Sequence, residues 1–229
     1  QSLLALVEEA EEPNLPEVED FGFYERLEFE KSALGLYISG HPFEGYESRV
    51  RPYITCDLAD LPYWRSGEVM ATVGGVIVSA RERYTKKGDP MGTLEIEDGE
   101  VKAEVVCFPR LWQQVKEIAS AGRVVIAVGK PRERSELSMI AEDVLPLEKA
   151  ERELTPLVKL RVNLERCQEP LVRDLYRELK RHPGKAPVLL ELSKESLNVL
   201  MQLKEIRVDP APSLFERLNE FANDVIEVV

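Results

Sequence analysis

Four basic residues surround a tyrosine in a short stretch near the middle of the chain. The cluster consists of Arg81, Arg83, Tyr84, Lys86 and Lys87. Lys and Arg neutralise phosphate groups, and an aromatic face stacks on bases without reading their sequence. The stretch therefore predicts a nucleic-acid interface. A solubilising charged turn, with its aromatic side chains in the core, is the alternative that the sequence leaves open.

A second basic cluster follows about forty-five residues later, and two aromatic residues between the clusters are further candidates for base stacking. The predicted nucleic-acid site then comprises Arg81, Arg83, Tyr84, Lys86, Lys87, Phe108, Trp112, Lys130, Arg132 and Arg134.

No catalytic motif accompanies these residues. The sequence has no phosphate-binding loop, no zinc-protease helix motif and no nucleophile elbow. Its two histidines each precede a proline at a predicted helix end, where a capping or solvated role is the simplest interpretation. We expect no catalytic residue, no metal and no cofactor in this chain.

The net charge of −12 over 229 residues argues against nucleic acid only at first sight. Residues 1–47 contain twelve carboxylates against two cations, so nearly all of the excess lies there and a local basic patch elsewhere is possible. A hydrophobic content of 44% excludes wholesale disorder. No apolar run is long enough for a membrane helix, and three scattered cysteines indicate a reducing cytoplasm.

The elements that must position the basic clusters are short strands over 68–148. Alternating apolar residues predict three strands, then a helix around Leu111 to Ile118, then two more strands, which is the order of an OB-fold barrel. The alternation changes parity at Gly74-Gly75, which predicts a β-bulge there. In such a barrel the two basic clusters occupy the two loops that border the binding groove.

The flanking segments predict a multidomain chain with an N-terminal helical linker, a five-stranded OB-fold β-barrel and a small C-terminal α/β domain. Residues 1–22 read as an acidic linker, 23–67 as a helical connector, 68–150 as the barrel and 151–229 as the α/β domain. The connector helix is expected to run to Ile38 and to stop at Gly40-His41-Pro42. In the last domain we expect strands at 157–162, 188–192, 199–203, 206–208 and 225–229, with helices at 171–179 and 212–221.

The stretch from Glu30 to Pro42, EKSALGLYISGHP, closely resembles a signature of bacterial replicative DNA polymerase III alpha subunits. The order of domains after it resembles the C-terminal region of that family. The resemblance implies a piece without the polymerase carboxylates, an OB domain that binds single-stranded template DNA, and a last domain that docks on the tau subunit of the clamp loader.

The resemblance also implies contact residues for two protein partners. A sliding-clamp peptide is expected at Gln1, Leu4 and Leu6, where a frayed helix end is the alternative. The tau contact is expected to use the last helix and strand through Leu214, Leu218, Phe221, Val225 and Val228. Two other classes stay open: a tRNA-binding OB-fold accessory module, and an OB-fold protein-interaction module that binds no nucleic acid.

Overall fold

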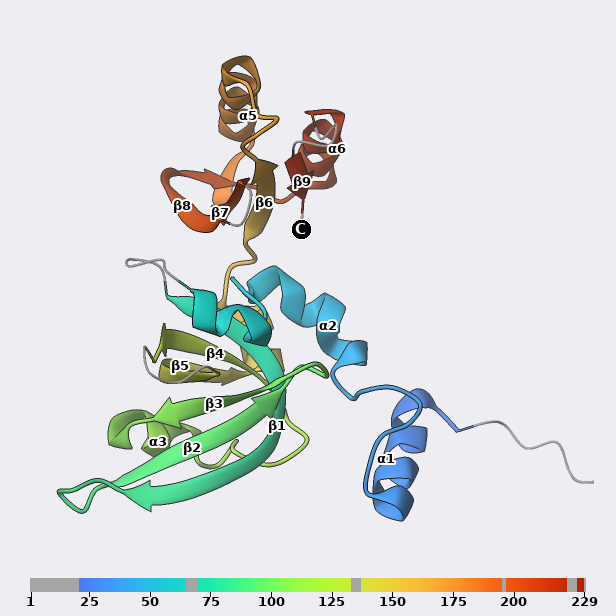
Figure 1. The fold of residues 1–229 in the computed structure, drawn as a ribbon, viewed down its shortest axis with the longest axis vertical. Helices are drawn as coiled ribbons and strands as arrows, with labels where there is room; N and C mark the ends of the chain where they lie inside the picture. Colours follow the sequence, from blue (N-terminus) through green and yellow to red (C-terminus); the bar gives the residue numbers. More distant parts are fainter. Residues whose placement is uncertain (1–20, 65–69, 133–136, 195–196, 222–225, 229) are drawn as a thin grey trace, which may run out of the picture. The chain divides into compact units, whose positions relative to one another are not determined.

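The structure is a computed structural model that describes residues 21–64, 70–132, 137–194, 197–221 and 226–228 (Figure 1). The chain forms two compact units, residues 1–40 and residues 41–229, which are described separately. Within the described residues, no helix is long and apolar enough to cross a bilayer.

The first unit contains helix α1 (Phe23–Leu34). The helix ends because Gly35 adopts a left-handed conformation, with φ of 77°, and donates its N–H to the carbonyl of Lys31 at 3.0 Å. The prediction that the helix continues to Ile38 and stops at Gly40 is therefore wrong. A glycine cap ends it about one turn earlier.

The loop after α1 is held by side chains of the signature segment. The Glu30 carboxylate accepts hydrogen bonds from the backbone N–H groups of Ile38 at 2.7 Å and Ser39 at 2.9 Å, and from the Ser39 hydroxyl. These bonds, those from Ser39 first, lower the pKa of Glu30. The Lys31 ammonium lies 4.7 Å from the centre of the Tyr37 ring, within cation–π range. The signature thus specifies a loop conformation.

The second unit begins with a histidine that ties the connector to the barrel. The Phe43 N–H donates to Nδ1 of His41 at 3.1 Å, so the ring proton resides on Nε2, which donates to Glu97 at 2.9 Å. The imidazole also packs on Gly99, where a Cβ would stand 3.2 Å from the ring. Burial alone would raise the pKa of Glu97, but the His41 hydrogen bond and the Lys102 charge outweigh it and lower this pKa.

The barrel consists of β1 (Ala71–Tyr84), β2 (Pro90–Glu97), β3 (Lys102–Cys107), β4 (Val124–Pro131) and β5 (Ser138–Pro146), closed in the order β1-β2-β3-β5-β4. Helix α3 (Pro109–Val115) lies between β3 and β4 in sequence. This is the predicted order of three strands, one helix and two strands. The expected fold class, an OB-fold barrel between a helical N-terminal segment and a C-terminal α/β region, is confirmed.

Strand β1 keeps its inward parity through the two glycines. Ala71, Val73 and Ile77 all point into the barrel core, while Val76 packs outward. The predicted bulge at Gly74-Gly75 is wrong, because the register shift lies between Ile77 and Ser79, just beyond the point where β1 passes from pairing with β4 to pairing with β2. Gly74 serves packing instead: a Cβ there would stand 2.2 Å from Val50.

A second, smaller core covers the outside of the barrel. It is formed by α2 (Glu44–Val50) and α4 (Leu147–Glu153), which pack on Val76 and Ile126 of the barrel strands. The 3-10 helices η1 (Arg51–Tyr53) and η2 (Leu58–Tyr63) complete the predicted connector, and the side chains of η2 join the barrel core. Helix α4 was not among the elements predicted from the sequence.

The C-terminal region is a sheet in the order β8-β7-β6-β9, built from β6 (Val158–Asn163), β7 (Pro183–Lys194), β8 (Leu197–Val208) and β9 (Ile226–Val228). Helices α5 (Glu169–Arg181) and α6 (Pro212–Phe221) supply Leu175, Leu179, Leu214 and Leu218 to its core. The two strands expected at 199–203 and 206–208 are one strand, since β8 pairs with β7 along both stretches.

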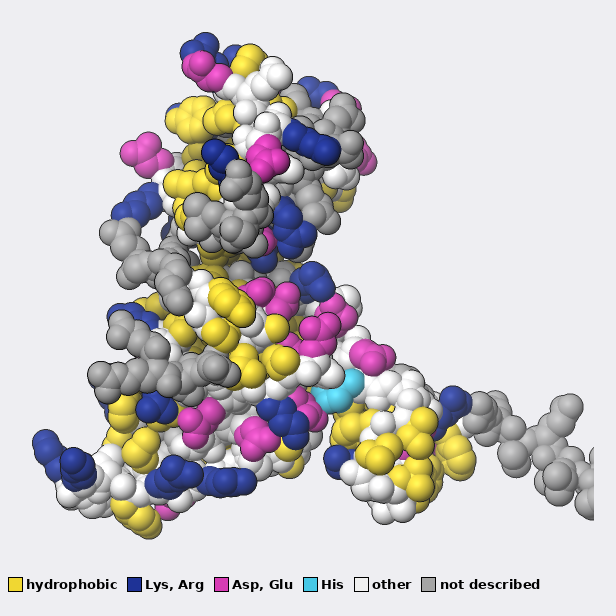
Figure 2. Space-filling model, in the orientation of Figure 1, with side chains coloured by type: hydrophobic (Ala, Val, Ile, Leu, Met, Phe, Trp, Pro, Cys, Tyr) yellow, Lys and Arg dark blue, Asp and Glu magenta, His cyan; other side chains and the backbone are white. Residues whose placement is uncertain are grey.

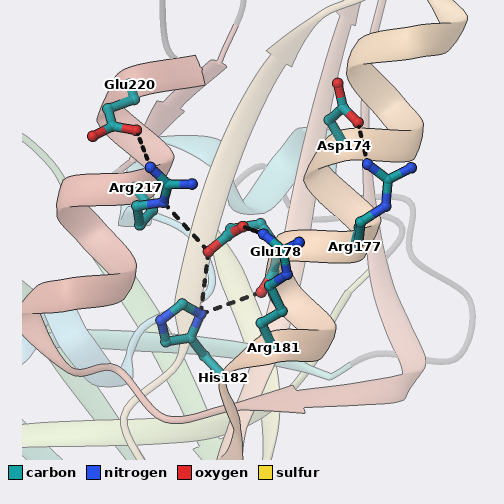
Figure 3. A network of polar contacts seen from close by, with 7 residues as sticks. All are labelled: Asp174, Arg177, Glu178, Arg181, His182, Arg217 and Glu220. Atoms are coloured by element: carbon teal, nitrogen blue, oxygen red, sulfur yellow. Dashed lines mark hydrogen bonds and ion pairs between the residues drawn. The ribbon is translucent and has the colours of Figure 1, made fainter.

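A buried carboxylate links the two helices of this region (Figure 3). Glu178 on α5 is 4% exposed and bonds to Arg181 at 3.0 Å. Its other oxygen lies 3.7 Å from both Arg217 of α6 and Nδ1 of His182. Because a buried carboxylate without cationic partners is costly, this network favours the observed pairing of α5 and α6.

Candidate nucleic-acid interface

The first basic cluster lies on a long hairpin whose turn has a defined geometry. The turn over 85–89 closes with hydrogen bonds from Thr85 N–H to the Asp89 carbonyl and from Gly88 N–H to the Thr85 carbonyl, both 2.9 Å long. Gly88 supplies the left-handed conformation, with φ of 85°. The turn presents Lys86 and Lys87, which are exposed, at the tip of the β1–β2 hairpin.

The arginines of the cluster lie on the outer face of β1. After the register shift, Ser79, Arg81 and Arg83 occupy alternate positions on the face opposite the core, and Arg81 stands directly across from Thr93 of β2. Dark-blue side chains gather over this hairpin in the space-filling view (Figure 2).

This outer face is hollowed into a groove of about 250 Å³ across β1, β2 and β3. Its lining residues are Ser79, Arg81, Arg83, Thr93, Glu95, Lys102, Ala103, Glu104 and Leu137. Leu137 immediately precedes β5, so the groove reaches from the β1–β2 hairpin to the connection between β4 and β5. Two of the predicted residues, Arg81 and Arg83, line it.

The cations of this surface differ in how far they are compensated. Among the residues that the structure describes, Arg81, Arg83, Lys86 and Lys87 form no ion pair. Lys102, in contrast, lies 3.6 Å from Glu95 and 3.4 Å from Glu97, and its pKa is raised, chiefly by the charge of Glu97.

Of the two described members of the second basic cluster, Arg132 reaches the groove. Arg132 lies 3.6 Å from Glu104, a lining residue, and its backbone N–H donates to the Ser138 carbonyl at 2.9 Å. Lys130 is not a lining residue and lies 4.0 Å from Glu142. Arg134 lies outside the described residues.

The three aromatic candidates have different environments. Tyr84 is 69% exposed and Phe108 is 49% exposed, so both offer a ring face to solvent. Trp112 is only 5% exposed, and its indole N–H donates to Glu82 at 2.7 Å. Its prediction as a stacking residue does not fit the structure, because the ring fills the space over Gly92, where a Cβ would stand 1.9 Å away.

Lys102 is the groove cation that the sequence prediction missed. Its signal was present: Ala103, Val105 and Cys107 alternate inward, so Lys102 and Glu104 must point to the same outer face as the β1 arginines. Lys102 has no basic neighbours in the sequence, so a search for clusters of basic residues does not find it.

The residues predicted to contact tau and clamp have mixed outcomes. Leu214 and Leu218 are fully buried in the C-terminal core, so their side chains are not exposed to a partner in this structure. Their helical spacing serves packing on the sheet. The side chains of Phe221 and Val228 are not described, although Val228 pairs with Leu160 through the backbone.

The clamp-peptide residues and one further tau residue lie outside the described part of the chain; they are Gln1, Leu4, Leu6 and Val225. In the part that is described, no group of three or more His, Cys, Asp or Glu side chains is arranged to hold a metal ion.

Comparison with known proteins finds relatives of the barrel and of most of the chain. A family model described as an OB-fold nucleic acid binding domain matches residues 71–147. DNA polymerase III subunit alpha of Pseudomonas aeruginosa is 29% identical over 92% of this chain, and that of Halalkalibacterium halodurans is 32% identical over 85%. The chain is homologous to a part of the DNA polymerase III alpha subunit.

This homology confirms the resemblance predicted from the signature segment. The chain spans less than one fifth of the length of these curated relatives, 18% and 17% respectively. Among solved structures, a Plasmodium falciparum SSB complex with ssDNA aligns with 36% of this chain and 95% of that chain at 11% identity. The TM-score of this alignment is 0.27.

Proposed function

We propose that the barrel binds single-stranded DNA along the outer face of β1, β2 and β3. The observation that carries this proposal is the groove lined by Arg81 and Arg83, two cations without an ion pair among the described residues, in a barrel that matches a nucleic-acid-binding OB family. Cations placed along a groove neutralise successive phosphates of a strand.

The exposed aromatic residues favour an unpaired strand over a duplex. Phe108 is exposed directly after β3, and an unpaired base can stack on such a ring, whereas a base inside a duplex cannot. Tyr84 is also exposed, but alternation along β1 places it on the face of the hairpin opposite Arg81 and Arg83. Lys86 and Lys87 at the hairpin tip add positive charge beyond the groove. Binding of this kind depends on backbone charge and stacking, so we expect little sequence preference.

The homology suggests a wider setting for this activity. We propose that the chain is a non-catalytic part of a bacterial replicative polymerase in the cytoplasm, holding single-stranded template while other segments contact the tau subunit and the sliding clamp. Several modest contacts on one chain give a high effective concentration and keep an assembly together. The clamp peptide at Gln1, Leu4 and Leu6 and the tau contact of the C-terminal region are part of this proposal.

Fluorescence anisotropy with labelled oligothymidylate at several salt concentrations tests the DNA-binding activity. Replacing Lys86 and Lys87 by Ser should weaken binding about equally for all sequences and reduce the salt slope by roughly 0.7 per lost phosphate contact. Arg173→Ser/Arg177→Ser is the matched control, since it removes the same charge from exposed positions of α5.

Parallel titration with a folded tRNA separates the other two classes. Tighter binding to tRNA than to oligothymidylate would favour the tRNA-binding module. Absence of salt-dependent binding to either nucleic acid would contradict the proposal and favour a protein-interaction module.

A further inference from the structure

Two carboxylates line the groove, where they would repel a strand of DNA. Glu95 of β2 and Glu104 of β3 stand directly opposite each other in the antiparallel pairing. Their side chains are 37% and 41% exposed, and both line the groove. Like charges directly opposite in a sheet destabilise it, so this pair needs a reason.

Each of these carboxylates holds one cation and faces one hydroxyl. Glu95 lies 3.6 Å from the Lys102 ammonium and accepts a hydrogen bond of 3.5 Å from Ser79. Glu104 lies 3.6 Å from the Arg132 guanidinium and accepts one of 3.4 Å from Ser138. The surroundings of each carboxylate are those that would suit a phosphate: a cation and a donor.

Fold stability gives little reason for these two pairs. Exposed ion pairs contribute on the order of 0–1 kcal/mol, and contacts longer than 3.3 Å belong to the weak end of that range. In contrast, both pairs lie where they reduce the positive charge that the groove offers to a strand. Arg81 and Arg83, on the same surface, are left uncompensated by the described residues.

We propose that Glu95 and Glu104 are negative determinants of strand binding. In the free protein Glu104 pairs with Arg132, and Glu95 pairs with Lys102, which Glu97 also holds at 3.4 Å. A phosphodiester must displace Glu104 to reach Arg132, and it competes with both Glu95 and Glu97 for Lys102. The groove then has permanently available cations on β1 and conditionally available cations on β3 and after β4. This inference rests on the proposed DNA-binding function and deepens it: the site is built to bind weakly enough to release a strand.

The direct test is to remove the negative charge while keeping the side-chain shape. Glu95→Gln and Glu104→Gln should each tighten binding of labelled oligothymidylate about 3- to 10-fold at low salt, the effect of one nearby unit charge in a high-dielectric setting. The double variant should also show a steeper salt dependence, by up to roughly 0.7 for the released Arg132, whereas Lys102 stays paired with Glu97. The gain should shrink as salt screens the groove.

Glu169→Gln on α5 is the matched control, because it removes one exposed, ion-paired carboxylate outside the groove. If the groove variants bind no more tightly than this control, the proposal is wrong. Weaker binding would also overturn it, because it would mean that the carboxylates make favourable contacts with bases. Thermal melting of each variant verifies that it is folded.

A double-mutant cycle on Arg132 and Glu104 gives an independent reading. Arg132→Ser should weaken binding little in the wild-type chain, where Glu104 compensates the guanidinium, and several-fold more in the Glu104→Gln chain. Equal effects in the two backgrounds would contradict displacement. Failure of the wild-type chain to bind any strand, with the Glu→Gln variants equally inactive, would instead contradict the proposed function itself.

Discussion

The signature segment and the groove differ in what their residues do. In the signature, Glu30 and Gly35 shape the loop after α1, and His41 ties the connector to Glu97 of the barrel. In the groove, Arg81 and Arg83 make no described ion pair, and their side chains face the solvent. The most recognisable stretch of the sequence is therefore structural, while the residues proposed to bind DNA lie in a stretch with no short motif.

This difference explains why the signature segment can be recognised in the sequence and the groove cannot. A loop closed by specific hydrogen bonds tolerates few residue types, so it remains visible as a motif. A charged groove requires only cations at suitable positions, and Lys or Arg can supply them from several strands. We therefore expect two independent effects. Substitutions in the groove should change DNA affinity but not the stability of the fold, and substitutions in the signature should change stability but not DNA affinity.

The largest effect is expected from Arg81→Ser/Arg83→Ser. Oligothymidylate binding should weaken about 10- to 100-fold at low salt, since each lost charge-assisted contact contributes roughly 1 kcal/mol or more. The melting temperature should stay near that of the wild type, because both side chains are exposed. Anisotropy titration and thermal melting measure the two quantities, with Arg173→Ser/Arg177→Ser as control. A large drop in melting temperature would contradict the expectation that these arginines serve binding and not folding.

A smaller effect is expected from His41→Ala, which should lower the free energy of unfolding by about 1–2 kcal/mol by leaving the half-buried Glu97 carboxylate with one partner fewer. His41→Gln, which can still donate to Glu97, should recover part of the loss. Denaturant unfolding measures both, and DNA affinity should not change.

The same variant has a pH signature. The pKa of Glu97 lies below its ordinary value, so Glu97 contributes stability above the unfolded-state pKa of about 4.3 and loses it as pH falls through the lower folded value. His41→Ala should therefore differ from wild type most at neutral pH and converge with it in acid. A constant difference across this range would exclude the His41–Glu97 bond as the cause.

The smallest effect is expected from Gly35→Ala, which places a side chain at a φ of 77° and should destabilise the end of α1 by about 1 kcal/mol. Hydrogen exchange at the Ile38 and Ser39 amides, which bond to Glu30, should become faster. Gly22→Ala is the matched control, because Gly22 has an ordinary φ of −60° and open space around it. Equal exchange in both variants would argue against the glycine cap.

The order of strands and helices could be predicted because alternation and helical spacing are local. The misassigned features depend on tertiary contacts. Phe108 caps α3 and Trp112 lies within it, and the packing of the Trp112 ring over Gly92 is a contact between residues twenty positions apart that spacing does not reveal. Leu214 and Leu218 form an apolar stripe that could pack either in a core or against a partner protein, and in the structure it packs on the C-terminal sheet.

The groove was predicted in part for a similar reason. Arg81 and Arg83 stand out because they are close in sequence, whereas Lys102 joins them only through strand pairing. The neutralising role of Glu95 and Glu104 depends on distances across three strands and on a residue after β4, which no spacing in the sequence reveals.

Strand β1 has its two ends in very different surroundings. Its first residues, such as Ala71 and Val73, are fixed in the barrel core, and its last residues project with β2 into solvent (Figure 1). The hairpin is an arm anchored in the barrel, and the strand pairs from Ser79 to Tyr84 fix the positions of the two arginines along it. At the base of this arm, the missing side chain of Gly74 lets Val50 of the helical connector lie against the backbone of the same strand.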